Sequence, residues 1–110
     1  MVIASEFWSW FEQYSDNYLS LNSLNNEDKE QLLDLLQDKL HEYCDKLYFE
    51  VGGEPGGVQE LIITAEGNID YFENVEELIN SAPVIDNWNF IAFIRLILKK
   101  FIIVNSLIFF

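Results

Sequence analysis

Residues 60–65, ELIITA, predict a β-strand in the interior of a sheet, because they are apolar on both faces of an extended chain. Another strand is expected just before it, where apolar and polar residues alternate over 47–51. The run 52–57, GGEPGG, breaks regular structure between them, since glycine permits positive φ and proline lacks a backbone donor. The two strands are therefore expected to form a β-hairpin.

Two helices are expected before this hairpin. Aromatic residues recur every three or four positions over 5–20, which is typical of a helix with one buried stripe. A second helix should begin after Asn25 or Asn26, either of which can cap it. Its buried stripe consists of Leu32, Leu36, Leu40, Tyr43 and Leu47.

A third helix is expected after the turn at 66–68, where Asp70 and Glu73 have the spacing of a capping box. Pro83 should end it, and residues 88–94, WNFIAFI, predict a further strand. The order ααββαβ predicts an α+β fold: a two-layer sandwich with a small, mostly antiparallel sheet.

Composition limits the function. The chain has 110 residues and a formal charge of -13, from 19 acids against 6 bases. This length suits one domain, and the charge argues against nucleic acid and against anionic membranes, because a basic footprint is missing. The single cysteine, Cys44, excludes an internal disulfide, and no basic residue precedes the first apolar run, so we expect a cytoplasmic protein without a signal peptide.

Charge divides the chain near Asn89, since every acid lies at or before Asp86 and only bases follow. We expect one domain over 1–95 and a distinct apolar tail over 96–110. The tail has three alternative interpretations: a transmembrane anchor, a further strand, or a non-native ending from a frameshift or truncation, which we favour.

Four segments carry a resemblance: FWSWF (7–11), DKLHEYCDKLYFEVGG (38–53), QELIITAEGN (59–68) and VEELINSAPVIDNWNFIAF (75–93). Together they resemble a family of uncharacterised small acidic bacterial proteins. Members of that family continue with a Lys-Pro-Pro-like sequence, whereas Phe93 is followed here by Ile94-Arg95-Leu96. The resemblance implies a truncated copy, and it brings no assigned activity or catalytic residues.

The far face of the second helix is the strongest candidate site. Opposite the leucine stripe, one wedge of the helical projection collects Glu27, Asp34, Asp38, His41 and Asp45. Such a stripe of charge can steer and dock a basic protein, although a solvent-exposed helix face has the same composition. Trp8 lies off the aromatic stripe of the first helix, so we expect it to be exposed and available as a contact residue.

The sequence offers only weak candidates for a metal, phosphate-binding or catalytic site. His41, Cys44, Asp38 and Asp45 have ligand-like spacings, yet His41 and Cys44 do not converge on one face, so we predict no metal and no cofactor. The glycine-rich run lacks the lysine of a phosphate loop, and the carboxylates Glu66 and Asp70 are explained as turn and cap residues.

Two functions remain as hypotheses. The first is a non-enzymatic interaction module of the inhibitor, immunity or regulator type, which binds a basic protein through its acidic helix face. The alternative is an inactive N-terminal fragment of a larger enzyme or ligand-binding protein.

Overall fold

The computed structural model describes residues 2–54, 56–98 and 101–109, with side chains through Ile94. Helices α1 (Ala4–Leu19) and α2 (Asn26–Tyr43) come first, and α3 (Phe72–Asn80) follows the hairpin. Short 3-10 turns occur at η1 (Leu21–Ser23) and η2 (Ile69–Tyr71). The strands are β1 (Tyr48–Gly53), β2 (Gln59–Thr64), β3 (Trp88–Leu98) and β4 (Phe101–Phe109). The predicted α+β class and the order ααββαβ are confirmed.

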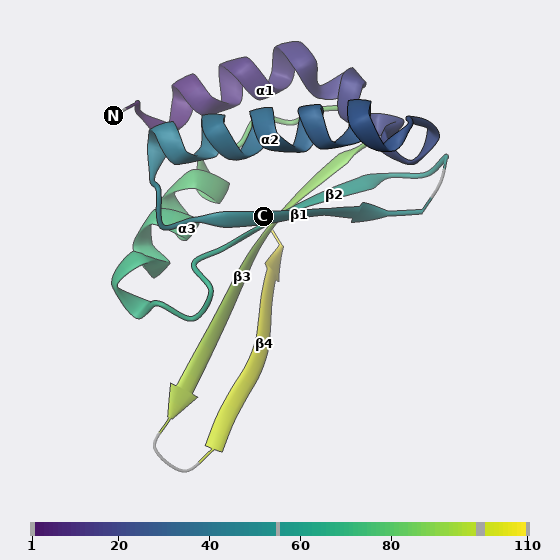
Figure 1. Cartoon of the computed structure of the whole chain (residues 1–110). Helices are drawn as coiled ribbons and strands as arrows, with labels where there is room; N and C mark the ends of the chain where they lie inside the picture. Colours follow the sequence, from purple (N-terminus) through teal and green to yellow (C-terminus); the bar gives the residue numbers. More distant parts are fainter. Residues whose placement is uncertain (1, 55, 99–100, 110) are drawn as a thin grey trace.

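The sheet has the order β1-β2-β3-β4. β1 and β2 form the expected antiparallel hairpin, with Val51 opposite Leu61. β2 and β3 run parallel because α3 carries the chain across between them, and β3 pairs with β4 in antiparallel fashion. Figure 1 shows α1 and α2 side by side over the sheet, with α3 beside β3, near the beginning of α1 and the end of α2.

The core lies between the helices and one face of the sheet. Leu61 and Ile63 on β2 are fully buried there, while Ile62 and Thr64 point to the other face and are half-buried. The aromatic stripe of α1 packs onto the same side, where the ring of Phe11 meets that of Phe90 edge-on at 5.8 Å. Burial of these large apolar groups is the main contribution to the stability of the fold.

The ends of the helices only partly follow the expectation. Asn25 caps α2 as predicted, since its Oδ1 accepts a hydrogen bond from the backbone N–H of Asp28 at 2.8 Å. The capping box predicted at Asp70 and Glu73 is wrong: α3 begins at Phe72 and has no side-chain cap. Instead, Asn68 Oδ1 accepts a hydrogen bond from the Asp70 N–H at 3.2 Å and caps the turn η2 that precedes α3. Short polar side chains commonly bind nearby backbone N–H groups in this way.

The expected tail adds a strand to the sheet. β3 continues to Leu98, past the boundary placed at residue 95, with an irregularity between Ile94 and Leu96. β4 then returns along it, and the two extend away from the helices as a hairpin (Figure 1). Residues 101–109 thus have the strand conformation that one of the three interpretations predicted, and a frameshift or truncation stays a prediction; residues 99, 100 and 110 lie outside the described part. Among the described residues, no helix is both long and apolar enough to cross a bilayer.

Candidate functional site

The acidic face of α2 is exposed as predicted. We define this acidic face as Glu27, Asp34, Asp38 and Asp45, all of which are exposed. Opposite them, Leu36 and Leu40 are fully buried against the sheet. Asp45 lies just past the end of α2, because the helix stops at Tyr43 and Cys44 is already extended. The face therefore combines a helical surface with the turn that leads into β1.

Basic side chains do not neutralise this face. Within the described residues the structure contains one ion pair, in which Lys39 Nζ lies 3.5 Å from Glu42 Oε2, and it involves no member of the acidic face. Asp34 and Asp38 are one helical turn apart, a spacing at which like charges on an exposed helix repel each other. Glu27 differs, because it lies in the first turn, where the helix dipole favours a negative charge.

His41 differs from the four exposed acids of the face, because its side chain is bonded toward the start of β1. The imidazole is half-buried, and its Nε2 lies 2.9 Å from the carbonyl oxygen of Leu47 and 2.9 Å from Gln37 Nε2. Its ring also packs edge-on against Tyr48 at 5.7 Å. The chain returns beside α2 as it enters β1, so the histidine connects the end of the helix to the start of the strand.

Trp8 is not a surface residue, so the prediction that it is an exposed contact is wrong. Its side chain is only 2% exposed, and its Nε1 donates to the carbonyl oxygen of Leu78 at 2.7 Å. Its indole ring packs on that of Phe90 in β3, with the ring centroids 4.6 Å apart, and its Nε1 faces α3, so the sheet and α3 together bury it. Trp8 consequently belongs to the core.

No metal site forms in the part of the chain that the structure describes. There, no group of three or more His, Cys, Asp and Glu side chains comes close enough to hold an ion. Cys44 is half-buried at the end of α2, while Asp38 and Asp45 are exposed and His41 faces β1. These four residues are thus dispersed.

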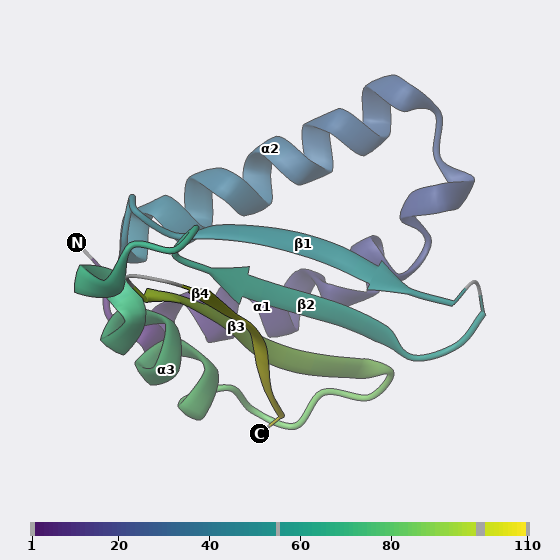
Figure 2. The same cartoon turned by 90° about the horizontal axis from the view of Figure 1, so that it is seen from below.

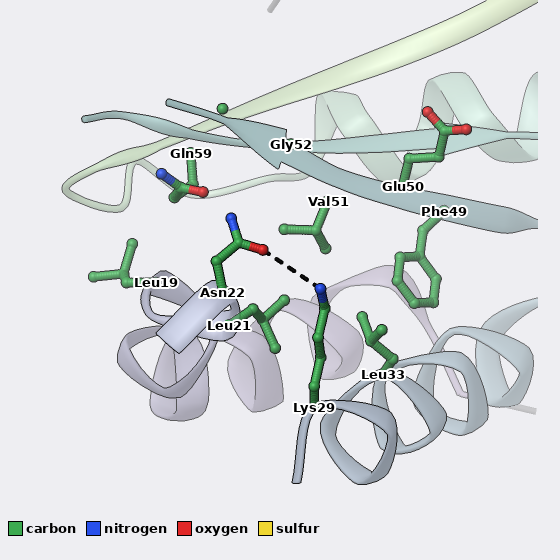
Figure 3. A pocket seen from close by; sticks show the side chains of 11 residues that line it. Leu19, Leu21, Asn22, Lys29, Leu33, Phe49, Glu50, Val51, Gly52 and Gln59 are labelled. Carbon is green, nitrogen blue, oxygen red and sulfur yellow. Dashed lines mark hydrogen bonds between the residues drawn. The ribbon is translucent and has the colours of Figure 1, made fainter. Parts of the chain in front are cut away.

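A groove that the sequence did not indicate lies on the other side of α2 (Figure 3). Figure 2 shows why it forms: α2 and β1 are close where the helix ends, and they diverge toward the beginning of the helix. The resulting space has a volume of ≈ 410 Å³. Its lining residues are Leu19, Leu21, Asn22, Lys29, Leu33, Phe49, Glu50, Val51, Gly52, Gly53 and Gln59.

Polar groups from three elements meet in this groove. Lys29 rises from α2 and Asn22 from η1, and Lys29 Nζ donates to Asn22 Oδ1 at 3.4 Å. Gln59, at the start of β2, is 8% exposed, and its Nε2 donates to the carbonyl oxygens of Glu54 and Gly57. In Figure 3 the Glu50 carboxylate points to the opposite side of β1 from Phe49 and Val51, as strand alternation requires.

A neighbouring hollow of ≈ 420 Å³ shares Leu19, Asn22 and Gln59 with the groove and continues toward Gly56 and Asn87. One residue in the sequence could have indicated this groove. Lys29 is one of only three basic residues before Arg95, and it directly follows the acids Glu27 and Asp28 in the first turn of α2.

Comparisons with family models, with curated proteins and with solved structures found no match to this chain. The resemblance to small acidic bacterial proteins therefore stays a prediction.

Proposed function

We propose that this chain is a non-enzymatic module that docks a basic protein surface through its acidic face. One observation carries the proposal: Asp34, Asp38 and Asp45 are exposed, and within the described residues none of them is paired with a cation. The formal charge of -13 extends the attraction beyond the contact itself, because the summed field of the domain steers a basic partner toward it.

Docking of a basic partner is favourable because it relieves the repulsion between the aspartates of the acidic face. Glu27 has a structural role at the positive end of the helix, whereas Asp34 and Asp38 lie in the middle of α2, beyond the reach of the dipole. A partner that brings lysine or arginine between them removes this repulsion and adds charge-assisted hydrogen bonds. These two aspartates, together with Asp45, are therefore the residues on which we place the interaction.

The test uses an octa-arginine peptide as the basic probe and follows the backbone amide resonances of the isotope-labelled protein. Asp34→Asn, Asp38→Asn and Asp45→Asn are combined in one variant. The matched control combines Glu12→Gln, Asp16→Asn and Glu76→Gln, which are exposed on α1 and α3 and change the net charge equally. We expect the largest shifts along α2, and an affinity about tenfold lower for the first variant than for the control.

Equal weakening in both triple variants would contradict the proposal, because it would mean that net charge alone attracts the peptide. Shifts concentrated on α1 or α3 would contradict it as well. Thermal unfolding of each variant verifies that the fold is intact before affinities are compared.

A further inference from the structure

We propose that the groove between α2 and β1 binds a ligand with a carboxylate next to an apolar group, and that the Lys29 ammonium receives the carboxylate. This inference concerns a different surface from the acidic face and does not depend on the proposed function. It rests on an ammonium with a neutral partner, on a partly apolar lining, and on the size of the space.

The charge of Lys29 is the first element of the argument. The side chain is half-buried, and the hydrogen-bond partner that the structure gives its Nζ is the neutral amide oxygen of Asn22, at 3.4 Å. Among the described residues, no carboxylate oxygen lies within ion-pair distance of it, although acids outnumber bases by 19 to 6 in the chain. The Lys29 ammonium is thus a positive charge that lines the groove without a counter-charge in the described part of the chain, and such a charge favours binding of an anion.

The donor pattern fits a carboxylate as the anion. Lys29 has further ammonium hydrogens beyond the one it donates to Asn22, and the Asn22 amide nitrogen carries two more. A carboxylate is an acceptor with two oxygens, so one ligand group can use both sets of donors. Gln59 uses its nitrogen to hold the loop at Glu54 and Gly57, which leaves its amide oxygen to accept an N–H from the ligand.

Part of the remaining lining is apolar. Glu50 also lines the groove, but its carboxylate points to the opposite side of β1 from Phe49 and Val51. Leu19, Leu33, Phe49 and Val51 line the groove, and Phe49 and Val51 are half-buried with their side chains toward it in Figure 3. A volume of ≈ 410 Å³ falls within the range of roughly 300–1,000 Å³ that small ligands occupy. A branched or aromatic side chain next to the carboxylate fills this space and covers apolar surface.

Two sources of this chemistry exist, and the structure suggests how to separate them. One is a free acid, such as an N-acylated amino acid. The other is the C-terminus of a peptide, which can extend along β1, because β1 is an edge strand of the described sheet and pairs only with β2. Both place a carboxylate next to an apolar side chain, but only the peptide gains backbone hydrogen bonds with the edge.

The experiment titrates the whole chain with N-acetyl-leucine, with an acetylated tetrapeptide that ends in leucine, and with the C-terminal amides of both compounds. Backbone amide shifts give the location and the dissociation constant. Lys29→Gln is the test variant, and Lys46→Gln is its control, because Lys46 is exposed and does not line the groove. Asn22→Asp is the second variant, since it places an internal carboxylate where the ligand's is expected.

We expect the acids to shift resonances of η1, β1 and the start of α2, while the amides bind at least about tenfold more weakly. Lys29→Gln and Asn22→Asp should each weaken the acids by about tenfold, and Lys46→Gln by less than about twofold. A preference for the tetrapeptide identifies a peptide terminus as the source, and equal affinity identifies a free acid. Absence of groove shifts, or equal affinity for acids and amides, would overturn the proposal.

Failure of the groove proposal and failure of the proposed function give different results in these variants. Lys29→Gln leaves the acidic face intact, so binding of octa-arginine should persist in it. Neutralisation of Asp34, Asp38 and Asp45 leaves the groove intact, so binding of the acids should persist in that variant.

Discussion

Trp8 Nε1 donates a hydrogen bond to the carbonyl oxygen of Leu78 at 2.7 Å, which joins the first helix to the third. Both residues are buried, with exposed fractions of 2% and 0%. Tyr43 makes a similar contact from α2, because its hydroxyl donates to the carbonyl oxygen of Asn74 at 3.2 Å. Through these two bonds α3 is attached to both of the helices that cover the sheet.

Trp88 provides a matched comparison for Trp8. Its side chain is 6% exposed, but its Nε1 is buried without a hydrogen-bond partner among the described residues. Trp8→Phe removes a hydrogen bond together with part of the ring, whereas Trp88→Phe removes an unpaired donor. We expect Trp8→Phe to lower the free energy of unfolding by about 1–2 kcal/mol more than Trp88→Phe does. Urea unfolding of the two variants checks this, and equal losses would refute the role given to the bond.

The cap of α2 should be measurable by itself. Asn25→Ala removes the oxygen that accepts the Asp28 N–H, and we expect the free energy of unfolding to fall by about 1 kcal/mol. Asn26→Ala is the control, because Asn26 is exposed and already helical, and we expect a change within about 0.5 kcal/mol. The assignment of the cap fails if Asn26→Ala is the more damaging substitution.

Gly53 is required by the backbone at the end of β1. Its φ is +117°, and a Cβ atom there would lie 2.6 Å from the carbonyl oxygen of Val58. Gly56 has φ +77°, and an added Cβ would meet none of the described atoms within 4 Å. Gly53→Ala should therefore lower the free energy of unfolding by at least about 2 kcal/mol, against about 1 kcal/mol for Gly56→Ala. Chemical denaturation measures both, and similar losses would argue against the close approach at Gly53.

Two buried tyrosines should make the fold sensitive to alkali. Burial raises the pKa of Tyr18 to about 12. The pKa of Tyr43 is also raised to about 12, mainly by burial and to a smaller extent by the negative charge of Glu77. The folded state holds these protons more tightly than the unfolded state, in which a tyrosine pKa is about 10. Their contribution to stability is thus complete below pH 10 and is lost as the pH rises toward 12.

Urea unfolding at several pH values between about 9 and 12 tests this assignment. Tyr43→Phe should reduce the decline of stability with pH, because phenylalanine has no proton to release. If the decline is as steep in Tyr18→Phe and in Tyr43→Phe as in the unchanged chain, these hydroxyls are not its cause.

Hydropathy patterns predicted the elements of this fold well. The recurrence of aromatic and apolar residues predicted one buried face of α1, made of Ile3, Phe7, Trp10, Phe11, Tyr14 and Tyr18. Phe7, Phe11 and Tyr18 are at most 2% exposed, whereas Ile3 and Tyr14 at its edges are exposed. Alternation over 47–51 and the apolar run at 60–65 predicted the hairpin of β1 and β2. These signals are local, since a helix or strand with one apolar side must bury that side wherever it lies.

What the sequence could not provide was the arrangement of elements relative to one another. Trp8 was predicted to be exposed because a helical projection represents one buried face, whereas its ring packs on Phe90 of β3 and its Nε1 bonds to Leu78 of α3. The groove depends on the divergence of α2 from β1, which follows from how both pack on the core and leaves no periodic pattern. Lys29 consequently resembled an ordinary surface lysine of a first helical turn.

The acidic face could be predicted because it depends on one regular helix, whereas the groove depends on how two elements pack. Asp34 and Asp38 lie opposite Leu36 and Leu40 on one regular helix, so burial of the leucines determines the exposure of the aspartates. His41 has the helical position that the projection gave it, but its imidazole is half-buried because it lies against the Leu47 carbonyl oxygen where the chain enters β1.

The acidic face is tested most directly by the salt dependence of octa-arginine binding, compared between the unchanged chain and a variant with Asp34→Lys, Asp38→Lys and Asp45→Lys. For the unchanged chain we expect the dissociation constant to rise about tenfold or more between about 20 mM and about 200 mM NaCl. The reversed variant should bind weakly at both concentrations. Binding that neither salt nor this charge reversal weakens would contradict docking through the acidic face.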